Sequence, residues 1–229
     1  MGRGASKVNG GGVAGGGTAK GGKITQADLA KMSIKKFDDY LNTLLTRSKR
    51  NELEAKGLNG RSDTQALVDA LGWHDKPTVL DDDTFDKVAR QSGAVVMHRG
   101  VHTEKSRNNT MYSDASYMGD GVYGDGLYFS TKKRTASSYA GGRGDGSNKM
   151  SAMLDMSKAK IVDYSDIRGE AFSLEVKSRY VNAMENTSLL AIKKGYNVIR
   201  CKNAGGTGDD YYVVLDRSAL IFREDSLVK

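Results

Sequence analysis

Residues 95–101 read VVMHRGV and residues 124–140 read GDGLYFSTKKRTASSYA, and these two stretches decide the fold. The first predicts a short buried strand, because β-branched side chains pack well on a pleated surface, and it places Arg99 at the C-terminal end of that strand. In the second, glycines let the chain bend before a strand over residues 127–131, and a helix begins at Thr135. The two strand ends are expected to converge on one cleft.

At these residues the chain resembles the ADP-ribosyltransferase superfamily. Met97-His98-Arg99-Gly100 stands where the arginine-serine-glutamate class has an aromatic-Arg-Gly strand, and Phe129-Ser130-Thr131 stands where that class has Ser-Thr-Ser. Ala136 and Tyr139-Ala140 follow in the expected order. Gly126-Leu127-Tyr128-Phe129 is similar instead to the Gly-(Ile/Leu)-Tyr-Phe strand of the poly-ADP-ribose polymerases. The resemblance mixes two subclasses and covers roughly residues 94–222.

The third element of the family is a Glu at the start of a late strand, preceded by a flexible loop. Residues 205–210 read GGTGDD and run into the strand-like Tyr211-Tyr212-Val213-Val214-Leu215. Only Asp is present here, so the resemblance puts Asp210 in the place of the Glu, with Asp209 as the next candidate. The chain also departs from the family at His98, where an aromatic residue is preferred, and at Lys132, which replaces the third Ser.

The resemblance implies an α+β protein with an ADP-ribosyltransferase-like split β-sandwich, flanking helices and a helical N-terminal extension. It implies a mono-ADP-ribosyltransferase that uses NAD as substrate and transfers ADP-ribose to a macromolecule, with a protein as the expected target and nucleic acid as the alternative. The implied catalytic residues are Arg99, Ser130 and Asp210. The implied NAD-binding residues are His98, Arg99, Gly100, Tyr128, Ser130, Thr131 and Tyr139.

These residue types suit that chemistry on physical grounds. A forked guanidinium such as Arg99 holds a pyrophosphate in a fixed orientation. Breaking the nicotinamide bond builds positive charge on the ribose, so a carboxylate such as Asp210 stabilises the transition state more than the ground state. Taken singly, the same features have other interpretations: a solvated Arg, a helix cap at Ser130-Thr131, and a turn at Asp209-Asp210. The order of the three elements favours the site.

Composition limits the alternatives. The chain has 229 residues, of which 38% are hydrophobic, so it can bury a substantial core. Cys201 lies in an apolar run, where a buried, unreactive thiol is expected. No apolar run of membrane-spanning length and no apolar signal-peptide core occur in the sequence, so we expect no membrane partner and a location in a host cytoplasm or a virion.

The basic charge is unevenly distributed. The net charge is +7, and residues 1–23 hold four basic residues and no acid, which leaves +3 on the rest. These residues predict a glycine-rich flexible arm. We therefore expect three parts: the arm at 1–23, a helical region at 24–92, and the transferase-like domain at 93–229.

The arm also supports an alternative function. A glycine-rich basic start before a compact body resembles ADP-ribosyltransferase-like proteins encoded near phage head genes. That resemblance implies a virion-associated structural or ejected protein, with weak or no activity, whose arm at residues 1–23 binds a virion or other assembly partner.

Helices and strands follow from local patterns. Thr25 and Asp28 predict a capping box that opens a helix extending toward Leu45. The run Asp81-Asp82-Asp83 is open to two interpretations, a metal cluster or a helix start, and capping is favoured because adjacent residues point in different directions. No metal site is proposed.

Further helices are expected at 63–71, 83–91, 171–184 and 188–194, and strands at 150–156, 160–164, 196–201 and 211–216.

Overall fold

The computed structural model describes residues 24–56, 62–114, 118–119, 121–140, 148–173 and 185–224. The arm at residues 1–23 and the last part of the helix predicted at 171–184 lie outside these described residues.

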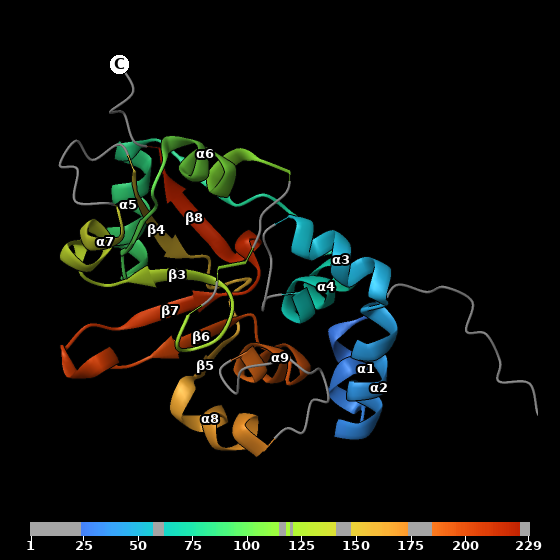
Figure 1. Ribbon diagram of the computed structural model, residues 1–229. Coiled ribbons are helices and arrows are strands. Elements are labelled where there is room, and N and C mark those ends of the chain that lie inside the picture. The colour runs from blue at the N-terminus through green and yellow to red at the C-terminus, as the bar shows by residue number, and fades with distance from the viewer. Residues whose placement is uncertain are drawn as a thin grey trace, which may run out of the picture.

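One mixed sheet of eight strands organises the described chain, in the order β1-β8-β4-β2-β3-β7-β6-β5 (Figure 1). The strands are β1 (Thr78–Leu80), β2 (Met97–Gly100), β3 (Leu127–Ser130), β4 (Lys149–Leu154), β5 (Ile161–Asp163), β6 (Val198–Cys201), β7 (Tyr211–Val214) and β8 (Leu220–Arg223). The β1–β8 and β5–β6 pairs are parallel, and the other pairs are antiparallel. Together with the helices, this sheet confirms the predicted α+β class.

The middle of the sheet is its narrowest connection. Strands β2 and β3 pair only where His98 lies opposite Ser130, whereas β2 pairs with β4, and β3 with β7, at four positions each. Two halves of four strands therefore meet at one residue pair. Helix α7 (Lys133–Tyr139) packs on β2 at this junction. A Cβ on Gly100 would lie 1.9 Å from the Ala136 carbonyl oxygen, so only glycine permits this approach.

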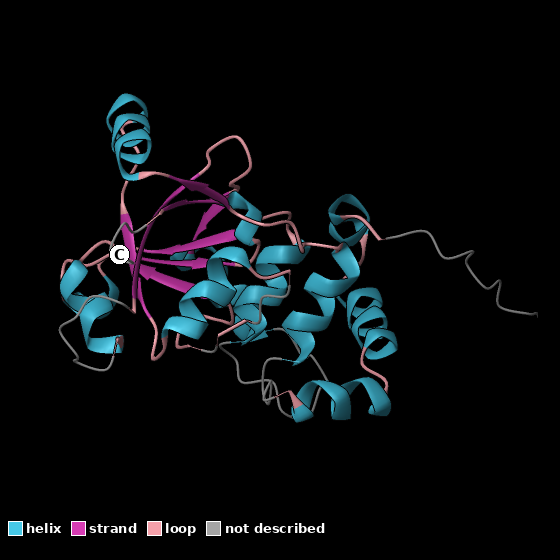
Figure 2. Cartoon of the chain, turned by 90° about the horizontal axis from the view of Figure 1, so that it is seen from above, coloured by secondary structure: helices cyan, strands magenta, loops and turns pink. Residues whose placement is uncertain are grey.

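The other helices surround the strands (Figure 2). They are α1 (Gln26–Lys31), α2 (Ile34–Leu44), α3 (Arg47–Ala55), α4 (Ser62–Leu71), α5 (Asp82–Ser92), α6 (Glu104–Tyr112), α8 (Tyr164–Ser173) and α9 (Glu185–Lys193). Helices α1 and α4 contact α9, which brings the N-terminal helices against the body of the protein (Figure 1).

A separate hydrophobic core packs against each face of the sheet. Along β6 and β7, Ile199 and Val213 face a cluster that includes the N-terminal Leu29 and Leu67 and residues of α9. Their neighbours along the same strands, such as Val198, enter a second cluster with residues of β2, β3, β4 and β8 on the opposite face. This alternation is expected for strands that are buried on both sides.

Several local predictions are confirmed. Thr25 accepts a hydrogen bond from the amide of Asp28 at 3.2 Å, and the Asp28 carboxylate accepts one from the amide of Thr25 at 3.1 Å, which completes the capping box. Asp81 is the N-cap of α5 and accepts from the amide of Thr84 at 2.9 Å. Cys201 is buried, and this burial, with smaller contributions from Asp163 and Asp210, raises the pKa of its thiol to about 12.

Other predictions are wrong in their boundaries. The strand expected at Val95 begins at Met97, and the side chain of Val95 is 52% exposed. Arg99 therefore lies within the strand. The helix expected to start at Ala171 starts at Tyr164, a residue predicted as strand. The first helix stops at Lys31, because Ser33 caps a new one by accepting from the amide of Lys36 at 3.3 Å.

Within the described residues, no helix has the length and apolar character needed to span a membrane.

Candidate functional site

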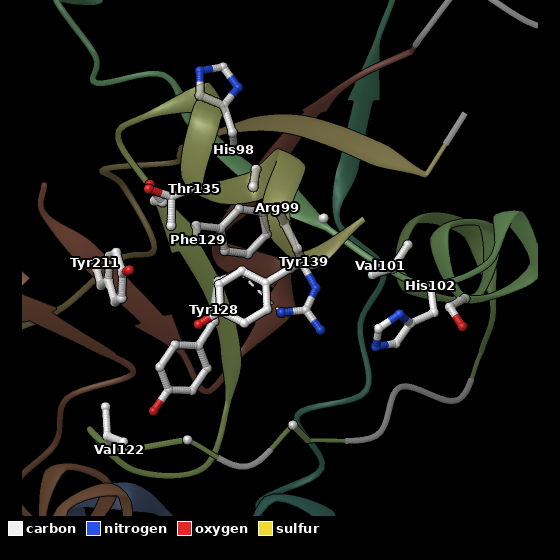
Figure 3. A pocket seen from close by; sticks show the side chains of 16 residues that line it. His98, Arg99, Val101, His102, Val122, Tyr128, Phe129, Thr135, Tyr139 and Tyr211 are labelled. Carbon is white, nitrogen blue, oxygen red and sulfur yellow. Dashed lines mark hydrogen bonds between the residues drawn. The ribbon is translucent and has the colours of Figure 1, made fainter. Parts of the chain in front are cut away.

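A cavity of about 430 Å³ opens beside the junction of the two half-sheets. Its volume lies within the range of about 300–1,000 Å³ that is typical of small-molecule sites. Strands β2 and β3, helix α7 and the first residue of β7 contribute to its walls (Figure 3). The lining residues are His98, Arg99, Gly100, Val101, His102, Ser106, Gly119, Gly121, Val122, Tyr128, Phe129, Ser130, Thr135, Ala136, Tyr139 and Tyr211.

Arg99 supplies the cation of this cavity. Its Nη1 donates a hydrogen bond to the carbonyl oxygen of Tyr128 at 3.0 Å (Figure 3). Its Nε is buried and has no hydrogen-bond partner, and burial lowers the pKa of the guanidinium to about 10. No carboxylate of the described chain pairs with Arg99. A buried cation without a counter-ion favours an anionic ligand, because such a ligand replaces the lost hydration.

Two glycines, Gly119 and Gly121, line the cavity with this cation and pack closely against their neighbours. A Cβ on Gly119 would lie 4.0 Å from Nη2 of Arg99 and 3.1 Å from the carbonyl oxygen of Gly126. A Cβ on Gly121 would lie 2.3 Å from the Tyr128 ring. The Tyr128 hydroxyl accepts from the amide of Tyr123 at 2.9 Å and donates to the carbonyl oxygen of Gly124 at 2.6 Å. The ring thus holds the glycine-rich wall in place.

Helix α4 supports the same wall from behind. Thr64 donates through Oγ1 to Oδ2 of Asp125 at 2.8 Å, and the amide of Met118 donates to Oε1 of Gln65 at 3.1 Å. Thr64, Gln65 and Asp125 are all buried. On the other side, Ser188 of α9 donates to the carbonyl oxygen of Asp125 at 2.8 Å. Side chains of the N-terminal helices therefore position a segment that lines the cavity.

The carboxylate of Asp209 lies next to the opposite wall. It accepts hydrogen bonds from the hydroxyls of Ser130 at 2.7 Å, Thr131 at 2.9 Å and Thr135 at 2.6 Å. Burial by itself would raise the pKa of Asp209, but these hydroxyls, with the amide of Lys132, outweigh it and hold the pKa below its usual value. Asp209 is 1% exposed and does not belong to the lining residues, whereas Ser130 and Thr135 do.

Asp210 is placed differently. Its carboxylate accepts from the amide of Asn203 at 2.9 Å, in the loop between β6 and β7. Its backbone pairs with Thr131, whose Oγ1 accepts from the Asp210 amide at 3.1 Å and whose amide donates to the Asp210 carbonyl at 3.0 Å. Asp210 does not line the cavity. Of the predicted catalytic residues, the structure brings Arg99 and Ser130 to the cavity and places Asp210 outside it.

The predicted NAD-binding residues are divided in the same way. His98, Gly100, Tyr128 and Tyr139 line the cavity, and Thr131 does not. The His98 ring points away from the Arg99 guanidinium (Figure 3). Its Nδ1 lies 3.1 Å from Oγ of Ser151. Burial, followed by the positive charges of Lys133 and Arg223, lowers the pKa of His98.

No protein-family model, no curated protein and no solved structure matches this chain.

Several lining residues were not predicted from the sequence, notably Thr135, Tyr211 and His102. Asp209 was only the second choice for the acid. No local signal separates Asp209 from Asp210, because the three hydroxyls that contact Asp209 come from a distant part of the chain. Thr135 carries no signal either, because a Thr near the start of a helix is most simply explained as a local helix contact.

Proposed function

We propose that this protein binds NAD in the cavity and acts as a mono-ADP-ribosyltransferase, with a protein as its target. The observation that carries this proposal is the pairing, in one cavity, of the Arg99 cation, which no described carboxylate compensates, with a wall of hydroxyls backed by the Asp209 carboxylate. The site therefore has a cation on one side and, on the other, a carboxylate that lies behind hydroxyl groups. This arrangement suits a ligand with a charged phosphate part and a sugar part.

The phosphate part would be held by Arg99. Arg99 donates one hydrogen bond, from Nη1 to Tyr128, and it lines the cavity, so the guanidinium has further donors for a pyrophosphate. A planar guanidinium binds phosphate oxygens in pairs, which fixes orientation as well as affinity. Burial costs free energy because it removes water from the charged guanidinium. An anion bound beside the guanidinium offsets this cost, so burial favours the binding of an anion.

The sugar part would face Ser130 and Thr135. During transfer, the bond between ribose C1′ and the nicotinamide nitrogen breaks and its electron pair leaves with nicotinamide. The acceptor nucleophile forms the new bond to C1′, and its proton passes to solvent. Positive charge that builds up on the ribose is stabilised by a nearby anion, and Asp209 accepts hydrogen bonds from both residues of this wall. We therefore assign Asp209 the role that the sequence suggested for Asp210.

Aromatic surfaces complete the site. Tyr128, Tyr139 and Tyr211 line the cavity, and Tyr139 is 61% exposed. Flat aromatic faces stack favourably with rings such as nicotinamide or adenine. The single pair that joins the half-sheets, His98 with Ser130, is also consistent with the split sheet expected for an ADP-ribosyltransferase-like fold.

Calorimetric titration with NAD tests the proposal. Arg99→Ala should weaken binding by about 1.5–3 kcal/mol, the typical contribution of a hydrogen bond to a charged group. Arg99→Lys should recover only part of this, because it keeps the charge and loses the fork. Arg134→Ala is the matched control, since Arg134 is an exposed arginine on α7 outside the cavity, and it should bind NAD as wild type does.

Two outcomes would contradict the proposal. Wild-type protein that binds NAD no better than about millimolar would exclude the cavity as an NAD site. Protein that binds NAD tightly but releases no nicotinamide and labels no protein target would have the binding site without the transferase activity, as expected for the alternative function of a virion component.

A further inference from the structure

Asp209 is the acid of the site but has almost no access to the cavity. Its side chain is 1% exposed, and both of its carboxylate oxygens are occupied by hydroxyl donors. Oδ2 receives Ser130 and Thr135, and Oδ1 receives Thr131. A ligand in the cavity therefore meets hydroxyl groups before it meets the carboxylate.

Thr135 is the hydroxyl best placed to mediate this contact. It lines the cavity from α7 and forms the shortest of the three bonds to Asp209, at 2.6 Å. Ser130 also lines the cavity, but its Oγ lies within hydrogen-bond distance of both the amide and the carbonyl oxygen of Lys132. Thr131 lies outside the cavity and accepts from the amide of Asp210.

The direction of the Thr135 bond decides what the cavity can recognise. A threonine hydroxyl has one proton and two lone pairs, and the proton of Thr135 is donated to Asp209. Toward the cavity this oxygen can only accept. Tyr211 also lines the cavity (Figure 3). The lone pairs of the Thr135 oxygen are what a ligand meets here, and they require a ligand group that donates.

We infer that Thr135, and not Asp209, touches the ribose of the substrate by accepting a hydrogen bond from a ribose hydroxyl, and that Asp209 is a positioning residue that acts through Thr135. This inference rests on the proposed function. Thr135 transfers no proton. Its oxygen is polarised by the carboxylate behind it, so the negative charge of Asp209 reaches the ribose through one shared hydroxyl.

Steady-state kinetics of nicotinamide release test the inference on the full chain. Thr135→Val keeps the shape of the side chain and removes the hydroxyl, and we expect kcat to fall about tenfold or more, with KM changed by less than about threefold. Thr135→Ser restores the hydroxyl and should return kcat to within about threefold of wild type. Ser137→Ala removes a hydroxyl of the same helix that bonds the Lys133 carbonyl and does not line the cavity, so it should match wild type.

A substrate analogue gives the sharper readout. NAD analogues that lack one hydroxyl of the nicotinamide ribose change the reactivity of the bond itself, but that change is common to all variants and cancels in a double-mutant cycle. If Thr135 accepts from that hydroxyl, its removal slows wild type more than it slows Thr135→Val, by about fivefold or more. Purely structural support by Thr135 predicts equal effects in both.

The possible outcomes separate the two proposals. Wild type that neither binds nor cleaves NAD overturns the proposed function, and this inference with it. Wild type that cleaves NAD while Thr135→Val retains full kcat, or while every deoxy analogue affects both proteins equally, overturns the inference and leaves the proposed function standing. A Thr135→Val defect in melting temperature that Thr135→Ser shares, without recovery of kcat, also overturns it.

Discussion

The Nη1 atom of Arg99 donates to the carbonyl oxygen of Tyr128 at 3.0 Å, which links β2 to β3 where the two half-sheets share only the His98–Ser130 pair. The same guanidinium lines the cavity and leaves its Nε without a partner. One arginine thus closes the weakest connection of the sheet and supplies the cation of the site. Occupation of the cavity by an anion is therefore expected to stabilise the junction between the half-sheets as well.

Gly100→Ala should destabilise the protein. A Cβ at this position meets the Ala136 carbonyl at 1.9 Å and the Ala140 amide nitrogen at 2.7 Å, so α7 would have to move away from β2. We expect a loss of about 1–3 kcal/mol in the free energy of unfolding, measured by urea denaturation. Gly169→Ala in α8 is the control. A Cβ at Gly169 would have nothing within 4 Å, so this change should leave stability unchanged or raise it slightly. Equal effects of both changes would contradict the close packing at Gly100.

Thr64→Val tests the support of the cavity wall by α4. The change removes a buried donor to the Asp125 carboxylate, and we expect the free energy of unfolding to fall by about 1–3 kcal/mol. Thr43→Val is the control. It removes an exposed hydroxyl that donates to a backbone carbonyl of the same helix, and it should change the free energy of unfolding by less than about 0.5 kcal/mol. Amide exchange around Tyr123 and Gly124 should accelerate in Thr64→Val alone. Unchanged exchange there would show that α4 does not hold this segment.

Acid should weaken the fold partly through Asp209. Three hydroxyl bonds hold the pKa of this carboxyl below its ordinary 3.8, so the unfolded chain binds the proton more readily than the folded one. The resulting stability is present above the unfolded pKa and is lost as the pH falls through the lower folded pKa. Urea denaturation at several pH values should show Asp209→Asn less stable than wild type near neutral pH, with the difference shrinking as the pH falls below 3.8. A difference that is constant with pH would assign the defect to packing.

Sequence patterns predicted those parts of the fold whose signals are local. The capping box at Thr25 and the cap at Asp81 depend on side chains three residues apart, so the chain itself specifies them. The runs that became β6 and β7 are largely buried on both faces, so their sequence is mostly hydrophobic, with Arg200 of β6 as the one charged residue. The resemblance to ADP-ribosyltransferases stays a prediction.

Elements without a local signal were missed. Helix α6 buries Arg107 and Thr110 together with Met111, so its sequence shows no apolar stripe. Strand β1 has only three residues and depends on pairing with β8, far away in the chain. The choice between Asp209 and Asp210 had the same cause, since the three hydroxyls that surround Asp209 lie more than 70 residues earlier in the sequence.

The two neighbouring aspartates allow the site assignment itself to be tested. Asp209→Asn exchanges an acceptor of three hydroxyl bonds for a neutral amide, so we expect NAD binding to change little and kcat to fall by about tenfold or more. Asp210→Asn alters a carboxylate that faces Asn203 outside the cavity, and kcat should stay within about threefold of wild type. Nicotinamide release and calorimetry on both variants measure the two quantities separately. The reverse ranking, with Asp210→Asn inactive and Asp209→Asn active, would restore the role that the sequence first suggested for Asp210 and would require the β6–β7 loop to turn toward the cavity on binding.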